Sequence, residues 1–149
     1  AEILGVTQLR EATVDDLPAA LSKLPDDELR RRLRHVVTEN DRVERTVELL
    51  RAGRITDIGP LLTASHSSLR DDYDVSCAEL DAAVDAALAA GALGARMTGG
   101  GFGGSVIALV PTDLIDHVGA AVVSAFAGHG FRPPVLRRVS PAQGARRES

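Results

Sequence analysis

The chain has 149 residues, 44% of them hydrophobic and 26% charged, which excludes a disordered segment and allows one domain with a real core. The formal net charge of −4 argues against nucleic acid as the main partner, and the single cysteine excludes an internal disulfide or a cysteine-rich zinc site. No apolar run could span a bilayer and residues 1–5 lack a basic signal region, so we expect no membrane partner and a cytoplasmic location. Because the chain starts without methionine, we also expect it to be a piece of a longer protein.

The first half of the chain predicts helices. The sequence predicts a short helix around residues 15–22. A long helix follows, whose start Asp26 or Asp27 can cap and which Gly53 ends. A second long helix has Pro60 in its first turn. Residues at three- and four-residue steps form the stripe of the first long helix: Leu29, Leu33, Val36, Val37, Asn40, Val43, Val47 and Leu50. The corresponding face of the second holds Ile55, Ile58, Leu62, Ser65 and Leu69.

The period changes in the second half. Residues 76–79, Ser-Cys-Ala-Glu, fit the capping box of a third helix, which Gly91 ends. Residues 95–98 and 105–110 then predict two short strands, the latter rich in β-branched and apolar residues. Between them lies a loop, residues 99–104, in which five of six residues are glycine.

The last part of the chain predicts one more helix and one more strand. Thr112 can cap the helix, and Gly128 and Gly130 close it. Residues 135–139 predict a strand that the two preceding prolines lead into or place at a sheet edge. The element order predicts an α+β fold, an antiparallel sheet with helices on one face, in a domain of residues 1–140 with a polar tail at 141–149.

The glycine loop has two interpretations. Gly99, Gly101 and Gly104 match the spacing of a dinucleotide fingerprint, but a strand follows where that motif needs a helix. No Lys-Ser or Lys-Thr follows the last glycine, so a P-loop is excluded as well. The bare loop either lets a phosphate or another backbone approach closely, or is a tight hairpin without a ligand.

The polar stretch at residues 64–76 also has two interpretations. It faces a site or another domain, or it is a solvated helix end, which residue types alone favour. The four histidines, at 35, 66, 117 and 129, lack the spacing of a metal site, and no nucleophile elbow is present. Cys77 is expected to be packed inside a helix. Composition alone leaves a Ser-His-Asp triad open.

Two of these stretches carry a resemblance to a known family. Residues 95–104, Ala-Arg-Met-Thr-Gly-Gly-Gly-Phe-Gly-Gly, resemble the third motif of galactokinases, which belong to the GHMP small-molecule kinases. Residues 65–80 are similar to the segment that precedes that motif. Residues 36–40 and 1–6 also fit the second half of that family, so the resemblance covers about residues 1–139. N-acetylgalactosamine kinases have a similar loop, which leaves the sugar open.

The resemblance implies a fold and a set of site residues. Such kinases have two lobes, of which the C-terminal one contains a ferredoxin-like sheet extended by helices. The glycine loop there supports the phosphate-binding loop of the other lobe, a role that passes to Gly99, Gly100, Gly101, Phe102, Gly103 and Gly104. Residues expected near the cleft between the lobes are Arg96, Thr98, Ser65, His66, Arg70, Asp71, Asp72 and Tyr73.

The sequence lacks the parts that the resemblance assigns to the other lobe. It has no Gly-Glu-His-Thr-Asp-Tyr sugar signature, no Gly/Ser-rich phosphate loop and no catalytic aspartate in such a context. The resemblance therefore implies that this chain contains no catalytic residue and no metal ligand. The resemblance thus implies the C-terminal lobe of a galactokinase, whose reaction is ATP- and Mg²⁺-dependent phosphorylation of α-D-galactose to galactose 1-phosphate. We expect this chain to be inactive alone, to bind neither ATP nor Mg²⁺ tightly, to need an N-terminal lobe and to self-associate through its exposed lobe interface. A galactokinase-like sugar sensor or regulator and a stand-alone ferredoxin-like binding module stay open.

Overall fold

The computed structural model describes residues 1–140 and residue 144. Within them, the helices are α1 (Leu17–Ser22), α2 (Asp27–Arg51), α3 (Gly59–Asp71), α4 (Ala78–Ala89) and α5 (Ile115–His129), and the strands are β1 (Gly94–Thr98) and β2 (Ser105–Leu109). Short 3₁₀ turns lie at Glu2–Leu4, Leu9–Glu11, Ile55–Ile58 and Thr112–Leu114. The described helices include none that is long and apolar enough to cross a membrane.

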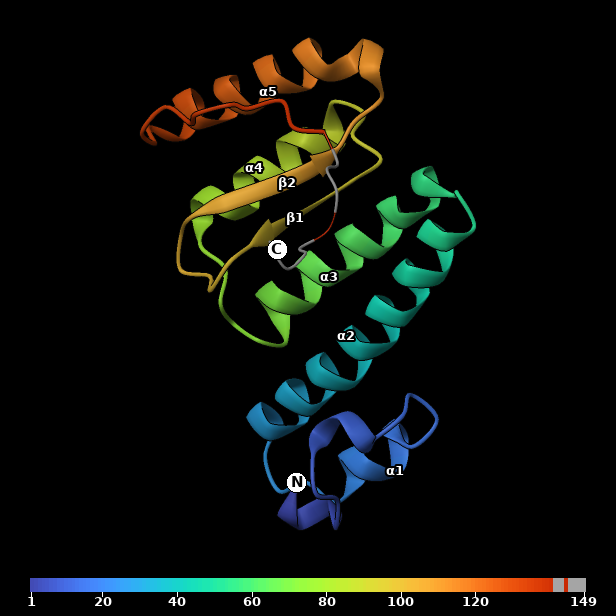
Figure 1. Cartoon of the computed structure of the whole chain (residues 1–149). Coiled ribbons are helices and arrows are strands. Elements are labelled where there is room, and N and C mark those ends of the chain that lie inside the picture. The colour runs from blue at the N-terminus through green and yellow to red at the C-terminus, as the bar shows by residue number, and fades with distance from the viewer. Residues whose placement is uncertain (141–143, 145–149) are drawn as a thin grey trace, which may run out of the picture.

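The long helix α2 has the ends that the sequence predicts. Asp26 accepts a hydrogen bond from the N–H of Leu29 at 2.8 Å, and Gly53 has a φ of 71° just past the end. α2 and α3 lie side by side and antiparallel, and the N-terminal segment packs on the first half of α2 (Figure 1). Leu33 and Val37 are buried against that segment. The far half of the predicted stripe is uncovered, since Val43 is 55% exposed.

The helix α3 runs along the edge of β1 that faces away from β2. The N–H of Met97 donates to Nδ1 of His66 on α3 at 3.3 Å, so this edge is satisfied by a side chain rather than by a strand. At the other end of the contact, Gly59 and Gly94 meet backbone to backbone. A Cβ on Gly59 would overlap the carbonyl oxygen of Leu93, and a Cβ on Gly94 would overlap that of Gly59.

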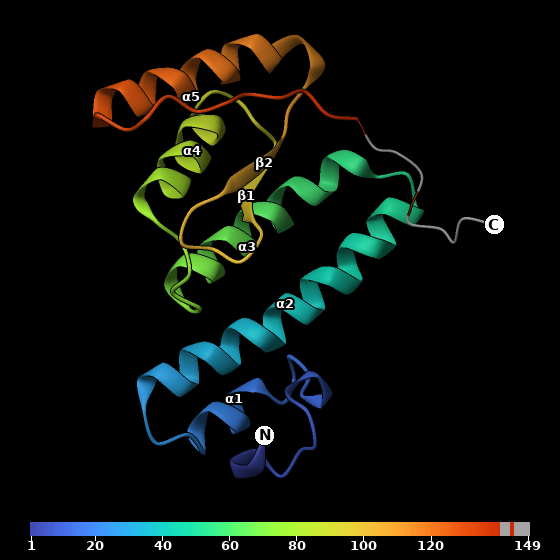
Figure 2. The same ribbon diagram turned by 60° about the vertical axis from the view of Figure 1, so that its left-hand side comes forward.

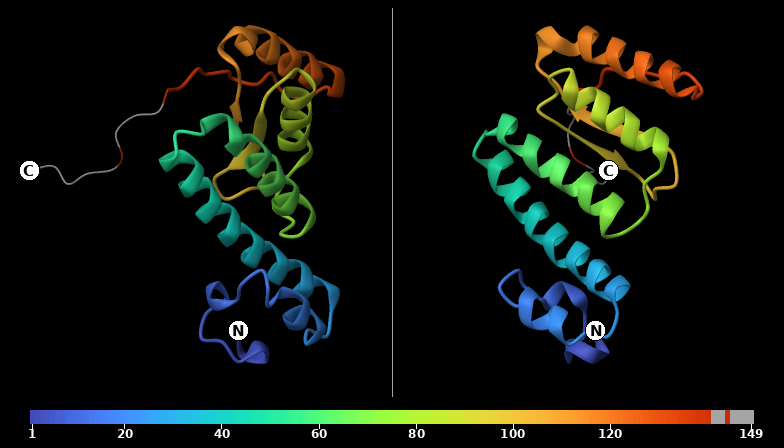
Figure 3. Two further views of the ribbon diagram at one scale, coloured as in Figure 1. Left: turned by 90° about the vertical axis from the view of Figure 1, so that its right-hand side faces the viewer. Right: turned by 180° about the vertical axis from the view of Figure 1, so that it is seen from behind.

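The two strands are covered by helices on one face, as predicted. Ala95 points into the main core, which α4 and α5 complete, and Met97 packs between α3 and α4. Figures 2 and 3 show α4 against the sheet and α5 beyond it. The main-core residues of the two helices are Ala83, Val84, Ala87, Val118, Val122 and Phe126. The fold is α+β, with a sheet of two strands in the described part of the chain.

Two helix starts differ from the prediction. Cys77, not Ser76, is the N-cap of α4, and no side chain caps this helix, so the predicted capping box is absent. Cys77 also lies just before the helix, not inside it as predicted. The hydroxyl of Ser76 instead donates to Oδ1 of Asp81, a carboxylate in the first turn of α4. Thr112 opens a 3₁₀ turn ahead of α5 and does not cap it, whereas Gly130 ends α5 with a φ of 72°, as predicted.

The predicted strand at residues 135–139 is wrong for this chain. The segment is irregular and runs along α5 (Figure 2), where Cδ1 of Leu136 lies 3.1 Å from the position that a Cβ on Gly119 would take. Pro133 and Pro134 cannot donate to a ladder, and the adjoining residues find no strand partner among those described. The predicted tail at 141–149 lies outside the described residues except for residue 144.

We predict that Gly59→Ala lowers the free energy of unfolding by about 1–3 kcal/mol, because the added carbon meets rigid backbone rather than a movable side chain. Gly128→Ala is the matched control, since it is also helical and nothing lies within 4 Å of the new carbon. Urea unfolding of both variants measures the difference. Equal midpoints would show that α3 can move away from β1 at little cost.

Candidate functional site: the glycine loop and a polar network beside it

The glycine loop between β1 and β2 needs its glycines for conformational reasons. Gly99, Gly101, Gly103 and Gly104 have φ values of 91°, 86°, 129° and 107°, which side chains with a Cβ rarely adopt. Nothing lies within 4 Å of a Cβ placed on Gly99, Gly100 or Gly103. The loop is therefore strained for other residues and open on its outer side.

One point of the loop is anchored to the connection between α3 and α4. The N–H of Phe102 donates to the carbonyl oxygen of Val75 at 2.7 Å. A Cβ on Gly101 would overlap that same oxygen, so only glycine permits the contact. The two stretches that carry the family resemblance, 65–80 and 95–104, thus meet in space.

Phe102 is the exception within the loop. Its φ is 59°, a left-handed conformation that is unusual for a bulky residue, and its ring is 77% exposed. The backbone is thus held in an unfavourable state that presents an aromatic ring to the outside. Such a ring has the chemistry of an anchor for a second surface.

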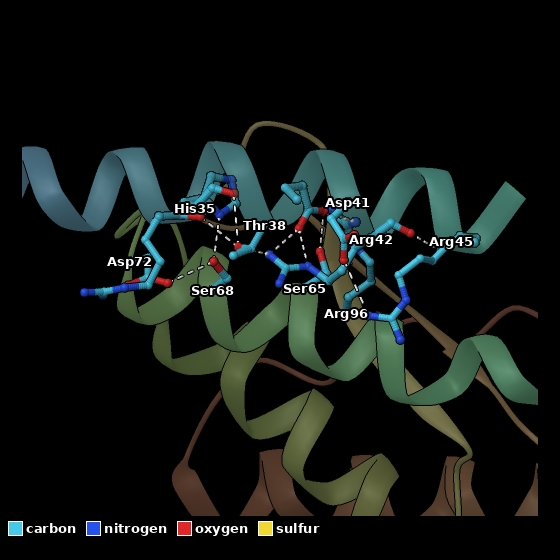
Figure 4. A network of polar contacts seen from close by, with 12 residues as sticks. His35, Thr38, Asp41, Arg42, Arg45, Ser65, Ser68, Asp72 and Arg96 are labelled. Atoms are coloured by element: carbon cyan, nitrogen blue, oxygen red, sulfur yellow. Dashed lines mark hydrogen bonds and ion pairs between the residues drawn. The ribbon is translucent and has the colours of Figure 1, made fainter. Parts of the chain in front are cut away.

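A polar network lies behind the loop, where α2, α3 and β1 meet (Figure 4). Oε1 of Glu39 accepts from Oγ of Ser65 at 2.6 Å and from Nη1 of Arg96 at 3.0 Å. Oε2 accepts from Nε of Arg42 at 2.8 Å. One carboxylate on α2 therefore binds α3 and the strand that leads into the glycine loop.

The charge of Glu39 is stabilised by its partners. Burial by itself raises the pKa of Glu39, but hydrogen bonds from Ser65 and Arg42 and the charges of Arg42 and Arg96 together hold it below the usual value. The guanidinium of Arg96 is fixed twice, since its Nε also donates to the carbonyl oxygen of Met97 at 2.9 Å. Arg96 is thereby held on the sheet face that α4 and α5 leave open.

The other end of the network contains Ser, His and Asp side chains, but it is not a catalytic triad. Oγ of Ser68 donates to Oδ2 of Asp72 at 3.0 Å, because an ionised carboxylate can only accept. Nδ1 of His35 lies 3.0 Å from Oγ of Ser68 and must then donate to it, because the proton of that hydroxyl is already engaged with Asp72. The histidine therefore cannot take the serine proton. Arg34 pairs with Asp72 at 2.7 Å, and Tyr73 stacks on His35 at 4.4 Å.

His66 is a second buried histidine with a structural role. Its Nδ1 accepts from the N–H of Met97, so the proton of the neutral ring is on Nε2. Nε2 lies 3.1 Å from Oδ1 of Asp81, although its N–H is not aligned for a hydrogen bond. Burial is the main cause that lowers the pKa of both His66 and His35. Both rings are thus neutral parts of the packing near pH 7.

The remaining predicted residues lie at the surface. Arg70 and Asp71 form a double contact with each other, at 2.8 and 3.2 Å, which holds the pKa of Asp71 below its usual value. Thr98 is exposed at the start of the loop. Of the eight residues expected near a cleft, Ser65 and His66 are buried inside the packing, while the others reach or approach the surface.

No three His, Cys, Asp or Glu side chains among the described residues converge as metal ligands would. A hollow of about 280 Å³ lies between the N-terminal segment and α2, lined by nine residues that include Thr13 and Asn40. It contains none of the predicted site residues, so it does not locate the chemistry.

Comparisons with known proteins agree with this arrangement. A family model described as "GHMP kinases C terminal" matches residues 46–128. The chain belongs to the GHMP kinase family. It is 55% identical to a galactokinase of Streptomyces coelicolor over 99% of its own length, and 46% identical to one of Mycobacterium tuberculosis over 95%.

The crystal structure of Lactococcus lactis galactokinase complexed with galactose is also similar. Its TM-score is 0.81 at 40% identity, over 87% of this chain and 34% of that one. The chain spans 38% and 39% of the two curated relatives, so its match lies within a part of each.

Sequence reasoning missed the residues at the centre of the network: His35, Glu39, Arg42 and Ser68. A usable signal was present in their spacing. Positions 35, 39 and 42 share one face of α2, and 65, 68 and 72 share one face of α3. Two polar stripes on consecutive antiparallel helices indicate a polar interface, which a search for apolar stripes does not find.

We predict that Glu39→Gln lowers the free energy of unfolding at pH 7 by about 1–3 kcal/mol, since it leaves two partly buried guanidinium groups without their carboxylate. Folding lowers the pKa of Glu39, so its contribution is present above the unfolded value of about 4.5 and is lost as pH falls through the folded one. The difference between variant and parent should therefore shrink in acid.

Urea unfolding at pH 7 and at a series of pH values that reaches well below 4.5 measures this difference, with Glu48→Gln on the exposed side of the same helix as control. The control should change stability by less than about 0.5 kcal/mol. A pH-independent loss in Glu39→Gln would show that shape, not charge, holds the three elements together.

Proposed function

We propose that this chain is the C-terminal lobe of a galactokinase, which transfers the γ-phosphoryl group of ATP to O1 of α-D-galactose. The observation that carries the proposal is the docking of the glycine loop on Val75, which joins the two family-like stretches. The 55% identity to a galactokinase supports the sugar class. N-acetylgalactosamine is the alternative substrate that a similar loop would serve.

The part of this lobe in the reaction follows from its open and anchored glycines. Phosphoryl transfer depends on positioning and charge stabilisation, so a support that fixes a phosphate-binding loop contributes to the rate without touching the reacting atoms. Gly99, Gly100 and Gly103 leave room for a second backbone to approach. Phe102, beside them, offers apolar area for that contact.

The described residues do not by themselves form a set of ligands for Mg²⁺ and ATP. Mg²⁺ bound to ATP supplies charge neutralisation between the β- and γ-phosphates in such reactions. The described carboxylates do not converge in threes, and those near the loop are engaged with arginine or serine. We therefore assign the ligands of the metal to the other lobe.

We predict that the chain alone forms no galactose 1-phosphate from galactose and ATP. A chimera that joins the preceding part of the Streptomyces coelicolor galactokinase to this chain should form it, because the two C-terminal parts are 55% identical. A coupled ADP-release assay with galactose and with N-acetylgalactosamine measures both. Activity of the purified chain alone would contradict the proposal that the catalytic residues belong to the other lobe. A folded chimera that binds sugar but turns nothing over would favour the sensor interpretation.

We also predict that Gly100→Ala separates function from stability. Gly100 lacks a positive φ and nothing lies within 4 Å of its Cβ, so the chain should unfold at the same urea concentration as the parent. In the active chimera the added methyl group should lower kcat/KM about tenfold, because it enters the space where the phosphate loop would rest. Gly128→Ala is the matched control and should leave kcat/KM unchanged. Full activity of Gly100→Ala would remove the supporting role from the loop.

A further inference from the structure

Met97, on the edge of β1 that faces α3, has both of its backbone groups bound by side chains. Its N–H donates to Nδ1 of His66 at 3.3 Å, and its carbonyl oxygen accepts from Nε of Arg96 at 2.9 Å. The side chain of Met97 is itself buried, with 1% of its surface exposed. A residue that is held at its N–H, its C=O and its side chain has little freedom. This one lies two positions before Gly99, where the glycine loop begins.

The contact of Arg96 with that carbonyl oxygen depends on Glu39. A long side chain that reaches the carbonyl of an adjoining residue has several other rotamers, so the contact alone would be weak. Here Nη1 of Arg96 also donates to Oε1 of Glu39 at 3.0 Å, and the two side chains are only 27% and 20% exposed (Figure 4). Glu39 is fixed in turn by Arg42 at 2.8 Å and by Ser65 at 2.6 Å. The carboxylate on α2 therefore holds the guanidinium of Arg96 in place over Met97.

The glycine loop needs an anchor of this kind because its own residues supply little rigidity. Five of its six residues are glycine, which has more backbone freedom than any other residue. Within the loop, the N–H of Phe102 donates to the carbonyl oxygen of Val75 at 2.7 Å. Gly99 and Gly100 lie between this point and Met97, and nothing lies within 4 Å of a Cβ placed on either. Their position is therefore set by the two anchors on either side of them.

We propose that Glu39 is a positioning residue for the glycine loop, and that it acts through Arg96 on the carbonyl oxygen of Met97. The inference rests on the proposed function, because a loop that supports a phosphate-binding loop must stand in one place to align the groups that react. Loss of the first anchor spreads the glycine loop over several positions. Only a fraction of the molecules then has the competent arrangement, and turnover falls with that fraction.

A carboxylate that only stabilised the fold would behave differently. Lower global stability accelerates the exchange of all core amides by the same factor, whereas loss of a local anchor accelerates exchange next to that anchor. Arg96→Lys separates the two roles at the level of atoms. A lysine has carbon where arginine has Nε, so the variant keeps a positive charge for Glu39 but loses the donor to Met97.

Amide hydrogen exchange of the chain alone, followed by NMR, tests the positioning role without any turnover. We expect Glu39→Gln and Arg96→Lys to accelerate exchange at Met97 and Phe102 roughly tenfold more than at the core amides of α5. Val122→Ala weakens the main core on α5 and is the destabilising control, so it should not favour those two amides over the core. Equal acceleration at all of these amides in Glu39→Gln would overturn the proposal.

The chimera described above gives the functional readout. At a temperature well below unfolding, Glu39→Gln and Arg96→Lys should each lower kcat about tenfold and leave KM for galactose within about twofold, since the resemblance assigns the sugar signature to the other lobe. Val122→Ala should leave kcat unchanged. In an active chimera, a kcat equal to that of the parent in either variant would overturn the positioning role and leave the kinase function standing. An inactive chimera, together with selective exchange at Met97 and Phe102 in the chain alone, would refute the kinase function and retain Glu39 as the anchor of the loop.

Discussion

The rest of the structure depends on the close approach of α3 to β1. At Gly59 and Gly94 the two backbones touch without side chains between them, and about two helical turns further along α3 the ring of His66 accepts a hydrogen bond from the N–H of Met97. This contact closes one edge of the sheet with a helix instead of a strand. It also brings the face of α3 with Ser65 and Ser68 to within hydrogen-bond reach of α2. Both the polar network and the route of the chain into the glycine loop follow from it.

The polar network has a different energetic character from the core. An ionised carboxylate that is partly buried loses hydration, and the structure offsets that loss with one hydroxyl and two guanidinium groups around Glu39. Such an arrangement adds less stability than apolar packing would, but it allows only one geometry, since each partner has a fixed donor direction. A network of this kind between α2, α3 and β1 sets where Arg96 and the following loop residues stand. The network therefore restricts the position of these groups in addition to what it contributes to stability.

Much of this fold could be predicted from local sequence. The ends of α2, the place of Pro60 in α3 and the two strands around the glycine loop follow from caps, periodicity and β-branched residues, which act within a few positions. The strand at 135–139 failed because a strand exists only with a partner, and its own residues do not contain that information. The capping box at Ser76 failed because Asp81, five residues on, accepts from the same hydroxyl. The network around Glu39 was missed because its members come from three elements whose contact depends on Gly59 and Gly94.

The glycine loop between β1 and β2 has a conformation that is costly to form. Four glycines and Phe102 with positive φ, together with the backbone freedom that glycines lose on folding, make the loop unfavourable for this chain. Within the described residues, the interactions that stabilise the loop are the hydrogen bond from the N–H of Phe102 to Val75 and the close approach of Gly101 to the same residue. A plain two-residue hairpin would join β1 to β2 with less strain. The proposed support of a phosphate-binding loop would offset this cost on the open side of the loop, where Gly99, Gly100 and Gly103 face no neighbour among the described residues.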